Sequence, residues 1–230
     1  MLACNRRSSL LTALVASSAL IVLLCLHGSA VAEPNPATGK DGLRQMLPGP
    51  LPPPQVGATE VLWDITHGVK FGYEPGGAYA PFVGVLSGLG YNFSTTAGGI
   101  DNIDLSSYDI LVICAGSSTM SPYTPNERAA AQAFVQTGGS ILILGDNANA
   151  WPENVNPLAQ GFGITVGLNR IEPLGLFFSN FLDHPVFTGI DEIYFVAGGG
   201  LGVVAPAIPI AWTNDGADIT IAALDGLCGY

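Results

Sequence analysis

The sequence predicts an α/β domain with a mainly parallel sheet and an antiparallel extension at its C-terminal end. The main observation is the run Ser140–Asp146, a continuous apolar segment that ends in a glycine and a carboxylate. Such a run, bounded by turn residues, is typical of a strand buried on both faces. A helix-like segment at 125–137 precedes it. Because this alternation of strand and helix repeats from 60 to 146, we expect right-handed crossovers between parallel strands.

The first 32 residues, 1–32, are interpreted as a secretion signal. Arg6 and Arg7 precede an apolar stretch, 10–26, and Ala30-Val31-Ala32 has the small-x-small pattern of a signal peptidase site before Glu33. The stretch is at the short end for crossing a bilayer, so a cleaved signal is favoured over a retained membrane anchor. We therefore expect a secreted or periplasmic protein, associated with a membrane only if this segment is not removed.

The charge balance excludes one class of partner. Cleavage would leave all 18 acidic residues but only five of the seven basic ones, for a formal net charge of −13. An acidic surface repels phosphate backbones, so nucleic-acid binding is not expected. Cys114 and Cys228 would also remain, and the sequence allows either a disulfide between them or two separate buried thiols.

A proline-rich linker is predicted at 33–58, ahead of a single folded domain at 59–230. The linker contains seven prolines and few large apolar residues. Such a composition is extended and semi-rigid rather than packed. The length of the remaining chain suits one domain with a core of its own.

The first half of the domain is expected to contain three strands and two helices ahead of the strand at 140–146. A strand at 61–66 leads through a glycine-rich loop to a helix at 78–89, where apolar residues recur at helical spacing. Gly90 is the expected stop signal, and a second strand follows at 91–95. A third strand, 109–114, precedes the helix at 125–137.

The start of that last helix is unusually clear. Thr124 has the position of an N-cap, Pro125 occupies the first turn, and Glu127 stands three residues after the cap. This pattern is a capping box with proline at N1. The capping role accounts for Glu127 without a catalytic one.

The second half of the domain is predicted to change character. A short helix near 157–159 feeds a strand at about 164, and a mixed loop at 177–189 holds His184, interpreted as a residue that shapes a turn. Asn214-Asp215-Gly216 is a strong hairpin signal. Four short strands are expected in an antiparallel extension on the edge of the sheet, at 192–196, 201–204, 208–213 and 219–224.

Several motifs occur in the order found in the class I glutamine amidotransferase-like superfamily. The chain resembles its non-catalytic or uncharacterised DUF4350-like branch, which is related to the ThuA-like group. The motifs that carry the resemblance are Asp64-x-x-His67-Gly68, the helix and two glycines before Ile141–Asp146, Asn156-Pro157-Leu158-Ala159 with Phe162-Gly163-Ile164, and Asp183–Ile190.

The resemblance implies a flavodoxin-like, doubly wound sheet with helices on both faces. It does not carry over glutaminase activity, because Asn147 follows the strand where the catalytic cysteine would be sought, and Cys114 lacks the Gly-x-Cys-x-Gly elbow. Family members often end with one more strand, and this chain stops at Tyr230 where that strand could begin. The domain is therefore expected to lack its last strand and to expose a sheet edge, which favours association.

Candidate site residues follow the predicted strand ends, where ligands bind in open α/β sheets. His67 could act as acid, base or ligand with Asp64 orienting it, or Asp64 could cap a turn while His67 packs against the loop. Asp146 and Asn147 could hold a hard cation, although a local Asx turn is favoured. Ser117 and Ser118 lack the Gly-x-Ser-x-Gly elbow of a serine hydrolase.

The function expected from the sequence is a non-catalytic binding or scaffold module for a small polar ligand, a carbohydrate or a cation. No cofactor and no metal centre are expected. One alternative is a hydrolase with His67 as base, assisted by Asp64 or Asp146. Another is a domain that docks a protein partner through an exposed sheet edge. The predicted ligand-binding residues are Asp64, His67, Gly68, Ser117, Ser118, Asp146 and Asn147.

Overall fold

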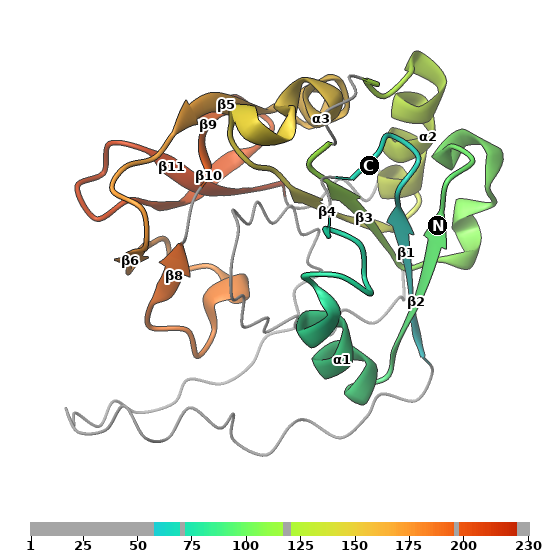
Figure 1. Cartoon of the computed structure of the whole chain (residues 1–230), viewed down its shortest axis with the longest axis horizontal. Coiled ribbons are helices and arrows are strands. Elements are labelled where there is room, and N and C mark those ends of the chain that lie inside the picture. Colours follow the sequence, from blue (N-terminus) through green and yellow to red (C-terminus); the bar gives the residue numbers. More distant parts are fainter. Residues whose placement is uncertain (1–57, 70–71, 117–120, 196–197, 225–230) are drawn as a thin grey trace, which may run out of the picture.

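The computed structural model describes residues 58–69, 72–116, 121–195 and 198–224 (Figure 1). The predicted secretion signal, nearly all of the proline-rich linker, Ser117, Ser118 and Cys228 lie outside these ranges. Within them, no helix is long and apolar enough to cross a membrane.

Four parallel strands form the central sheet, which confirms the predicted α/β class. They are β1 (Thr59–Asp64), β2 (Tyr91–Thr96), β3 (Ile110–Cys114) and β4 (Ser140–Leu144), in the order β2-β1-β3-β4. The chain steps from β1 to β2 on one side and then crosses to β3 on the other side of β1. The carboxyl ends of β1 and β3 therefore flank a topological switch point, where open α/β sheets leave room for ligands.

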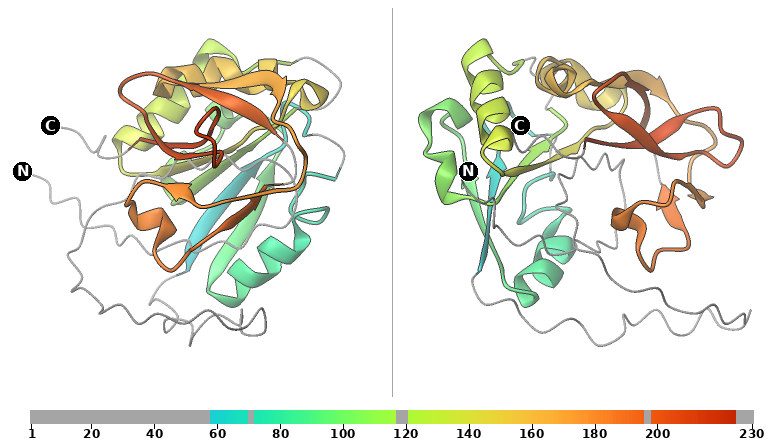
Figure 2. Two further views of the ribbon diagram at one scale, coloured as in Figure 1. Left: turned by 90° about the vertical axis from the view of Figure 1, so that its left-hand side faces the viewer. Right: turned by 180° about the vertical axis from the view of Figure 1, so that it is seen from behind.

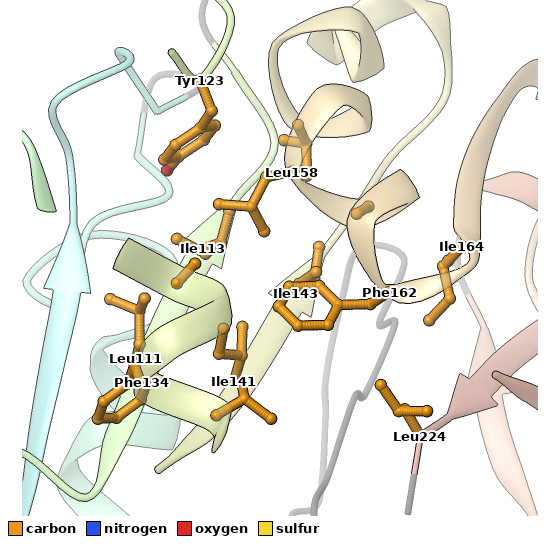
Figure 3. Close-up of a cluster of buried hydrophobic side chains, with 14 of the residues drawn as sticks. Leu111, Ile113, Tyr123, Phe134, Ile141, Ile143, Leu158, Phe162, Ile164 and Leu224 are labelled. Atoms are coloured by element: carbon orange, nitrogen blue, oxygen red, sulfur yellow. The ribbon is translucent and has the colours of Figure 1, made fainter. Parts of the chain in front are cut away.

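Helices pack on both faces of this sheet. They are α1 (Ala80–Gly88), α2 (Pro125–Gln136) and α3 (Pro152–Ala159). Alternate strand residues point to opposite faces. On one face, Leu111 and Ile141 pack with Phe134 of α2 and Leu158 of α3 (Figure 3). On the other, strand residues such as Trp63 pack with α1 and with the C-terminal half of the chain.

The predicted capping box at the start of α2 is confirmed. The side chain of Thr124 accepts a hydrogen bond from the backbone N–H of Glu127 at 3.3 Å, and Oε2 of Glu127 accepts from the Thr124 N–H at 2.9 Å. After the helix, Gly139 passes close to the ring of Phe134, where a Cβ atom would lie 2.3 Å from the ring carbons. This position has room only for glycine, so the turn into β4 is tight.

The C-terminal half forms three separate antiparallel sheets rather than one continuation of the parallel sheet (Figure 2). The predicted Asn214-Asp215-Gly216 turn joins β10 (Ile208–Trp212) and β11 (Ile219–Ala223), as expected. The pairs are β5 (Ile164–Arg170) with β9 (Gly199–Val203) and β6 (Leu176–Phe178) with β8 (Ile193–Phe195), and the third sheet contains β7 (Asn180–Phe181), β10 (Ile208–Trp212) and β11 (Ile219–Ala223).

These sheets contribute side chains to both buried clusters of the core. Ile210 and Ile221 belong to the buried cluster that contains Trp63, and so do Phe178 and Phe195. Ile164 and Leu224 belong to the other buried cluster, with Leu111 and Ile141. Burial of large apolar side chains explains why these sheets pack against the rest of the domain. Short 3-10 turns connect the elements: η1 (Ile100–Asn102), η2 (Leu105–Ser107), η3 (Ala148–Ala150), η4 (Gln160–Phe162) and η5 (Pro185–Phe187).

Candidate functional site

Asp64 is the last residue of β1, and its carboxylate is buried and hydrogen-bonded on both oxygens. Oδ2 accepts from the hydroxyl of Tyr123 at 2.5 Å. Oδ1 accepts from the backbone N–H of Thr66 at 2.9 Å, which shapes the turn after the strand. Gly68 completes this turn with a φ of 65°, a conformation that glycine adopts without steric cost. Asp64 therefore holds the turn that presents His67.

Both ring nitrogens of His67 are hydrogen-bonded. Nδ1 lies 2.7 Å from the backbone carbonyl oxygen of Ser121, and Nε2 lies 2.7 Å from Oε1 of Glu127. The side chains of His67 and Glu127 are only 9% and 4% exposed. Since a carbonyl oxygen can only accept, Nδ1 must carry a proton. Nε2 faces a carboxylate oxygen, so both ring nitrogens of His67 lie against hydrogen-bond acceptors.

Glu127 has two roles, of which the capping box accounts for one. Its Oε2 closes the cap of α2, and its Oε1 reaches His67, 60 residues earlier in the chain. Desolvation raises the pKa of this carboxyl, but hydrogen bonds from the Thr124 backbone, His67 and the Thr124 hydroxyl outweigh burial and leave the pKa lowered. Glu127 is thus an anion at neutral pH, and its Oε1 faces Nε2 of His67.

Tyr123 lies between His67 and Asp64. Its ring centroid is 3.9 Å from that of His67, with the two planes at 39°, while its hydroxyl donates to Asp64. Burial, and then the charge of Asp64 and the hydrogen bond to it, raise the pKa of the Tyr123 hydroxyl. Tyr123 therefore stays neutral and acts as a hydrogen-bond donor. It also separates the two residues that the sequence placed together as a His–Asp pair.

Asn154 of α3 ties the loop after β1 to the segment before α2. Its Oδ1 accepts from the N–H of Ser121 at 2.8 Å, and its Nδ2 donates to the carbonyl of His67 at 3.3 Å. Its own carbonyl accepts from the N–H of Tyr123 at 3.2 Å. Gly116 makes room for it, since a Cβ there would lie 2.4 Å from Nδ2 of Asn154. We call Asp64, His67, Tyr123, Glu127 and Asn154 the buried network.

Exposed polar groups surround the buried network. The N–H of Gly99, in the loop after β2, donates to the hydroxyl of Thr66 at 2.9 Å. A Cβ on Gly99 would lie 2.7 Å from Oδ1 of Asp101, 3.1 Å from Nδ2 of Asn102 and 3.3 Å from Oε1 of Glu127. Asp101, Asn102 and Ser121 are exposed. We call these three residues the rim; they come from the loops after β2 and β3 and lie beside the switch point.

Asp146 and Asn147 belong to a different cluster. Oδ1 of Asp146 accepts from the N–H and side-chain amide of Asn147 at 2.7 and 3.0 Å, and Oδ2 accepts from the hydroxyl of Tyr73 at 3.2 Å. Oδ1 of Asn147 accepts from the N–H of Asn149 at 3.0 Å, so Asn147 is the N-cap of η3. Tyr73 packs with the core on the α1 side of the sheet. This pattern fits the Asx turn favoured from the sequence.

Two further residues considered from the sequence, Cys114 and His184, have structural surroundings. Cys114 is a free, buried cysteine, and burial raises the pKa of its thiol. His184 caps η5 by accepting from the N–H of Val186, which agrees with its predicted turn-shaping role. Across the described ranges, no group of three or more His, Cys, Asp or Glu residues is arranged to hold a metal ion. Tyr123, Asn154 and Ser121 were missed because no local pattern marks them.

The comparisons with known proteins show a fold and no family. No family model matches the chain, and no curated protein does. Among solved structures, the "mmIFT52 N-terminal domain" is similar with a TM-score of 0.52 at 15% identity, over 74% of this chain and 87% of that one. A "Cytoplasmic Protein STM3548 from Salmonella typhimurium" has a TM-score of 0.47 at 14% identity, over 72% and 86%. At such identities the likeness concerns the fold alone.

Proposed function

We propose that this chain is a secreted or periplasmic, non-catalytic binding module with a flavodoxin-like, amidotransferase-like fold. The strand order β2-β1-β3-β4 supports the fold, because it matches the first four positions of the flavodoxin order 2-1-3-4-5. The two faces covered by α1 and by α2 with α3 also fit a doubly wound sheet. The secretion signal and the amidotransferase-like motifs rest on the sequence.

The hydrogen bonding of His67 is the observation that carries the non-catalytic assignment. A general base needs a free lone pair, and both ring nitrogens of His67 lie against acceptors, Nδ1 against a carbonyl and Nε2 against a carboxylate. Asp64 is likewise saturated by Tyr123 and Thr66. These residues hold β1, α2 and α3 in place, so their role is structural.

The rim supports a small polar ligand. Asp101, Asn102 and Ser121 offer a carboxylate, an amide and a hydroxyl to solvent beside the switch point. Such groups can accept hydrogen bonds from sugar hydroxyls or supply oxygen ligands to a hard cation. The ionised Glu127 adds negative potential behind them, which favours a neutral or cationic ligand over an anion.

A thermal-shift screen of sugars and divalent cations tests this function. A ligand present at one hundred times its Kd stabilises the folded chain by about 2.7 kcal/mol, which is readily measured. The Asp101→Ala variant should lose the shift, while Asp191→Ala, which removes an exposed carboxylate in the C-terminal half, should keep it. The rim site is refuted if no compound shifts the wild type, or if Asp101→Ala responds as fully as the wild type.

A second candidate, a serine hydrolase, is favoured by one specific alignment. The hydroxyl oxygen of Ser121 lies 3.4 Å from Nδ1 of His67, whose Nε2 contacts Glu127. The three residues thus have the order of a nucleophile, a base and an orienting carboxylate. The reaction would require Nδ1 to give up its proton and its shorter bond to the Ser121 carbonyl.

Labelling with a fluorophosphonate separates the two candidates. The non-catalytic module should show no labelling above a heat-unfolded sample. Labelling of the folded wild type at Ser121, abolished in Ser121→Ala, would establish the hydrolase and overturn the non-catalytic assignment.

A further inference from the structure

The outer face of the β6–β8 ribbon carries an exposed apolar surface. Its strands alternate, with Phe178 and Phe195 buried and their neighbours Phe177 and Tyr194 exposed by 54% and 44%. Phe177 pairs with Tyr194 across the ribbon, and their ring centroids are 4.6 Å apart. Large aromatic side chains in contact with one another and with solvent are characteristic of interaction sites.

Leu174 extends this surface. It is 49% exposed and precedes Gly175, where a Cβ would lie 3.0 Å from the hydroxyl of Tyr194. We call Leu174, Phe177 and Tyr194 the ribbon patch. In Figure 1, β6 and β8 lie on the opposite side of the molecule from β1 and β2, so the ribbon patch is distinct from the rim.

Acidic residues stand at both ends of the ribbon. The antiparallel register pairs Phe178 with Ile193, which places Asp191 and Glu192 at one end, and it pairs Leu176 with Phe195, which places the segment with Glu172 at the other. All three carboxylates belong to exposed residues. Arg170 is ion-paired with Glu172 and offsets its charge, so the negative charge beside the ribbon comes mainly from Asp191 and Glu192.

We propose that the ribbon patch docks a cationic, amphipathic peptide segment of a protein partner. The aromatic pair supplies an apolar anchor at the centre, and the exposed carboxylates of Asp191 and Glu192 supply negative charge that complements lysine or arginine. The strong negative charge of the chain after the predicted cleavage disfavours anionic partners. The rings of Phe177 and Tyr194 lean together at 40°, so they do not present one flat surface on which a sugar ring would stack.

Peptide binding to the full chain tests the proposal. The probes are a fluorescent peptide of alternating leucine and lysine and a matched peptide with glutamate in place of lysine. The lysine peptide should bind, and the glutamate peptide should not. Phe177→Ser with Tyr194→Ser should weaken binding by about tenfold or more, since buried aromatic anchors dominate interface energies.

Matched variants separate this site from non-specific attraction to an acidic protein. Val85→Ser and Val204→Ser remove exposed apolar side chains elsewhere, 61% and 68% exposed, and should bind the lysine peptide like the wild type. Asp191→Lys with Glu192→Lys should weaken binding of the lysine peptide. Unchanged thermal melting of all variants shows that the fold is intact.

Several outcomes would overturn the proposal. Binding that survives Phe177→Ser with Tyr194→Ser would show charge attraction without the patch. Patch-dependent binding of a hexasaccharide in place of the peptide would make the ribbon a carbohydrate surface. Patch-dependent dimerisation in size-exclusion chromatography, without peptide binding, would make it a contact between copies of this chain. Asp101→Ala should leave peptide binding unchanged, so the rim and the ribbon patch can fail separately.

Discussion

Replacing His67 with alanine should destabilise the protein, because His67 is a structural part of the buried network. The substitution removes two hydrogen bonds of 2.7 Å, to the Ser121 carbonyl and the Glu127 carboxylate, and a ring contact with Tyr123. It also leaves Glu127 as a buried anion without its partner. A catalytic histidine, in contrast, is often held at a cost to stability, so its removal leaves stability unchanged or raises it.

The loss should be about 3 kcal/mol. Hydrogen bonds to charged groups contribute about 1.5–3 kcal/mol each, and removing one partner of a buried ion pair costs about 3–5 kcal/mol. The lower end applies because the His67 side chain remains 9% exposed and water can partly replace it. In a domain of this size about 1 kcal/mol lowers Tm by about 2–4 °C, so we expect a fall of about 6–12 °C.

A double-mutant cycle with Glu127→Gln gives the assay its internal control. Glutamine is accepted at the third position of a capping box, so this variant tests mainly the charge that faces His67. In urea unfolding, the double variant should lose about 1–2 kcal/mol less than the two single losses together, because both remove the same contact. Full additivity, or a His67→Ala variant as stable as the wild type, would refute the structural role of His67.

Three further predictions concern buried or partly buried groups, Tyr123, Glu127 and Cys114. Tyr123→Phe should lower the free energy of unfolding by about 1–3 kcal/mol in urea, because Asp64 would keep a buried oxygen without its donor; a loss below about 0.5 kcal/mol would contradict its burial. The lowered pKa of Glu127 means that its stabilisation is complete above its ordinary value of 4.5 and is lost as the pH falls through the lower, folded pKa. The stability difference between wild type and Glu127→Gln should therefore shrink as the pH falls below about 4.5, and a difference that persists undiminished in stronger acid would disprove this. Burial raises the pKa of the Cys114 thiol, so iodoacetamide at pH 8 should alkylate Cys114 only after the protein is unfolded, as measured by mass spectrometry of the peptide that contains it. Rapid alkylation of the folded protein would contradict this.

Local signals made much of the first half of the fold predictable. The strands at 109–114 and 140–146 were visible as apolar runs, and the structure places β3 and β4 there, with β4 ending two residues earlier. The start of α2 was predictable from Thr124, Pro125 and Glu127, because a capping box involves residues only three positions apart. The hairpin between β10 and β11 was equally readable from its turn residues.

The C-terminal sheets were harder to place than to detect. Short strands were expected where β8 to β11 lie, and the structure has antiparallel strands there, but they form sheets of their own. The strands β6 and β7 lie where mainly a loop was expected. Strand pairing depends on which distant segments bury each other's apolar faces, as Phe178 and Ile210 do with Trp63. The alternation of residues within one strand does not contain that information.

The candidate site was also predictable only in part from the sequence. From the sequence alone came the position of Asp64 and His67 at a strand end and the local turn of Asp146 and Asn147, because each depends on residues within a few positions. Only the tertiary structure showed that Nε2 of His67 contacts the carboxylate of Glu127, 60 residues away in the chain. Hydrogen-bond partners of a buried side chain are set by how helices pack on the sheet, and that packing is a property of the whole chain.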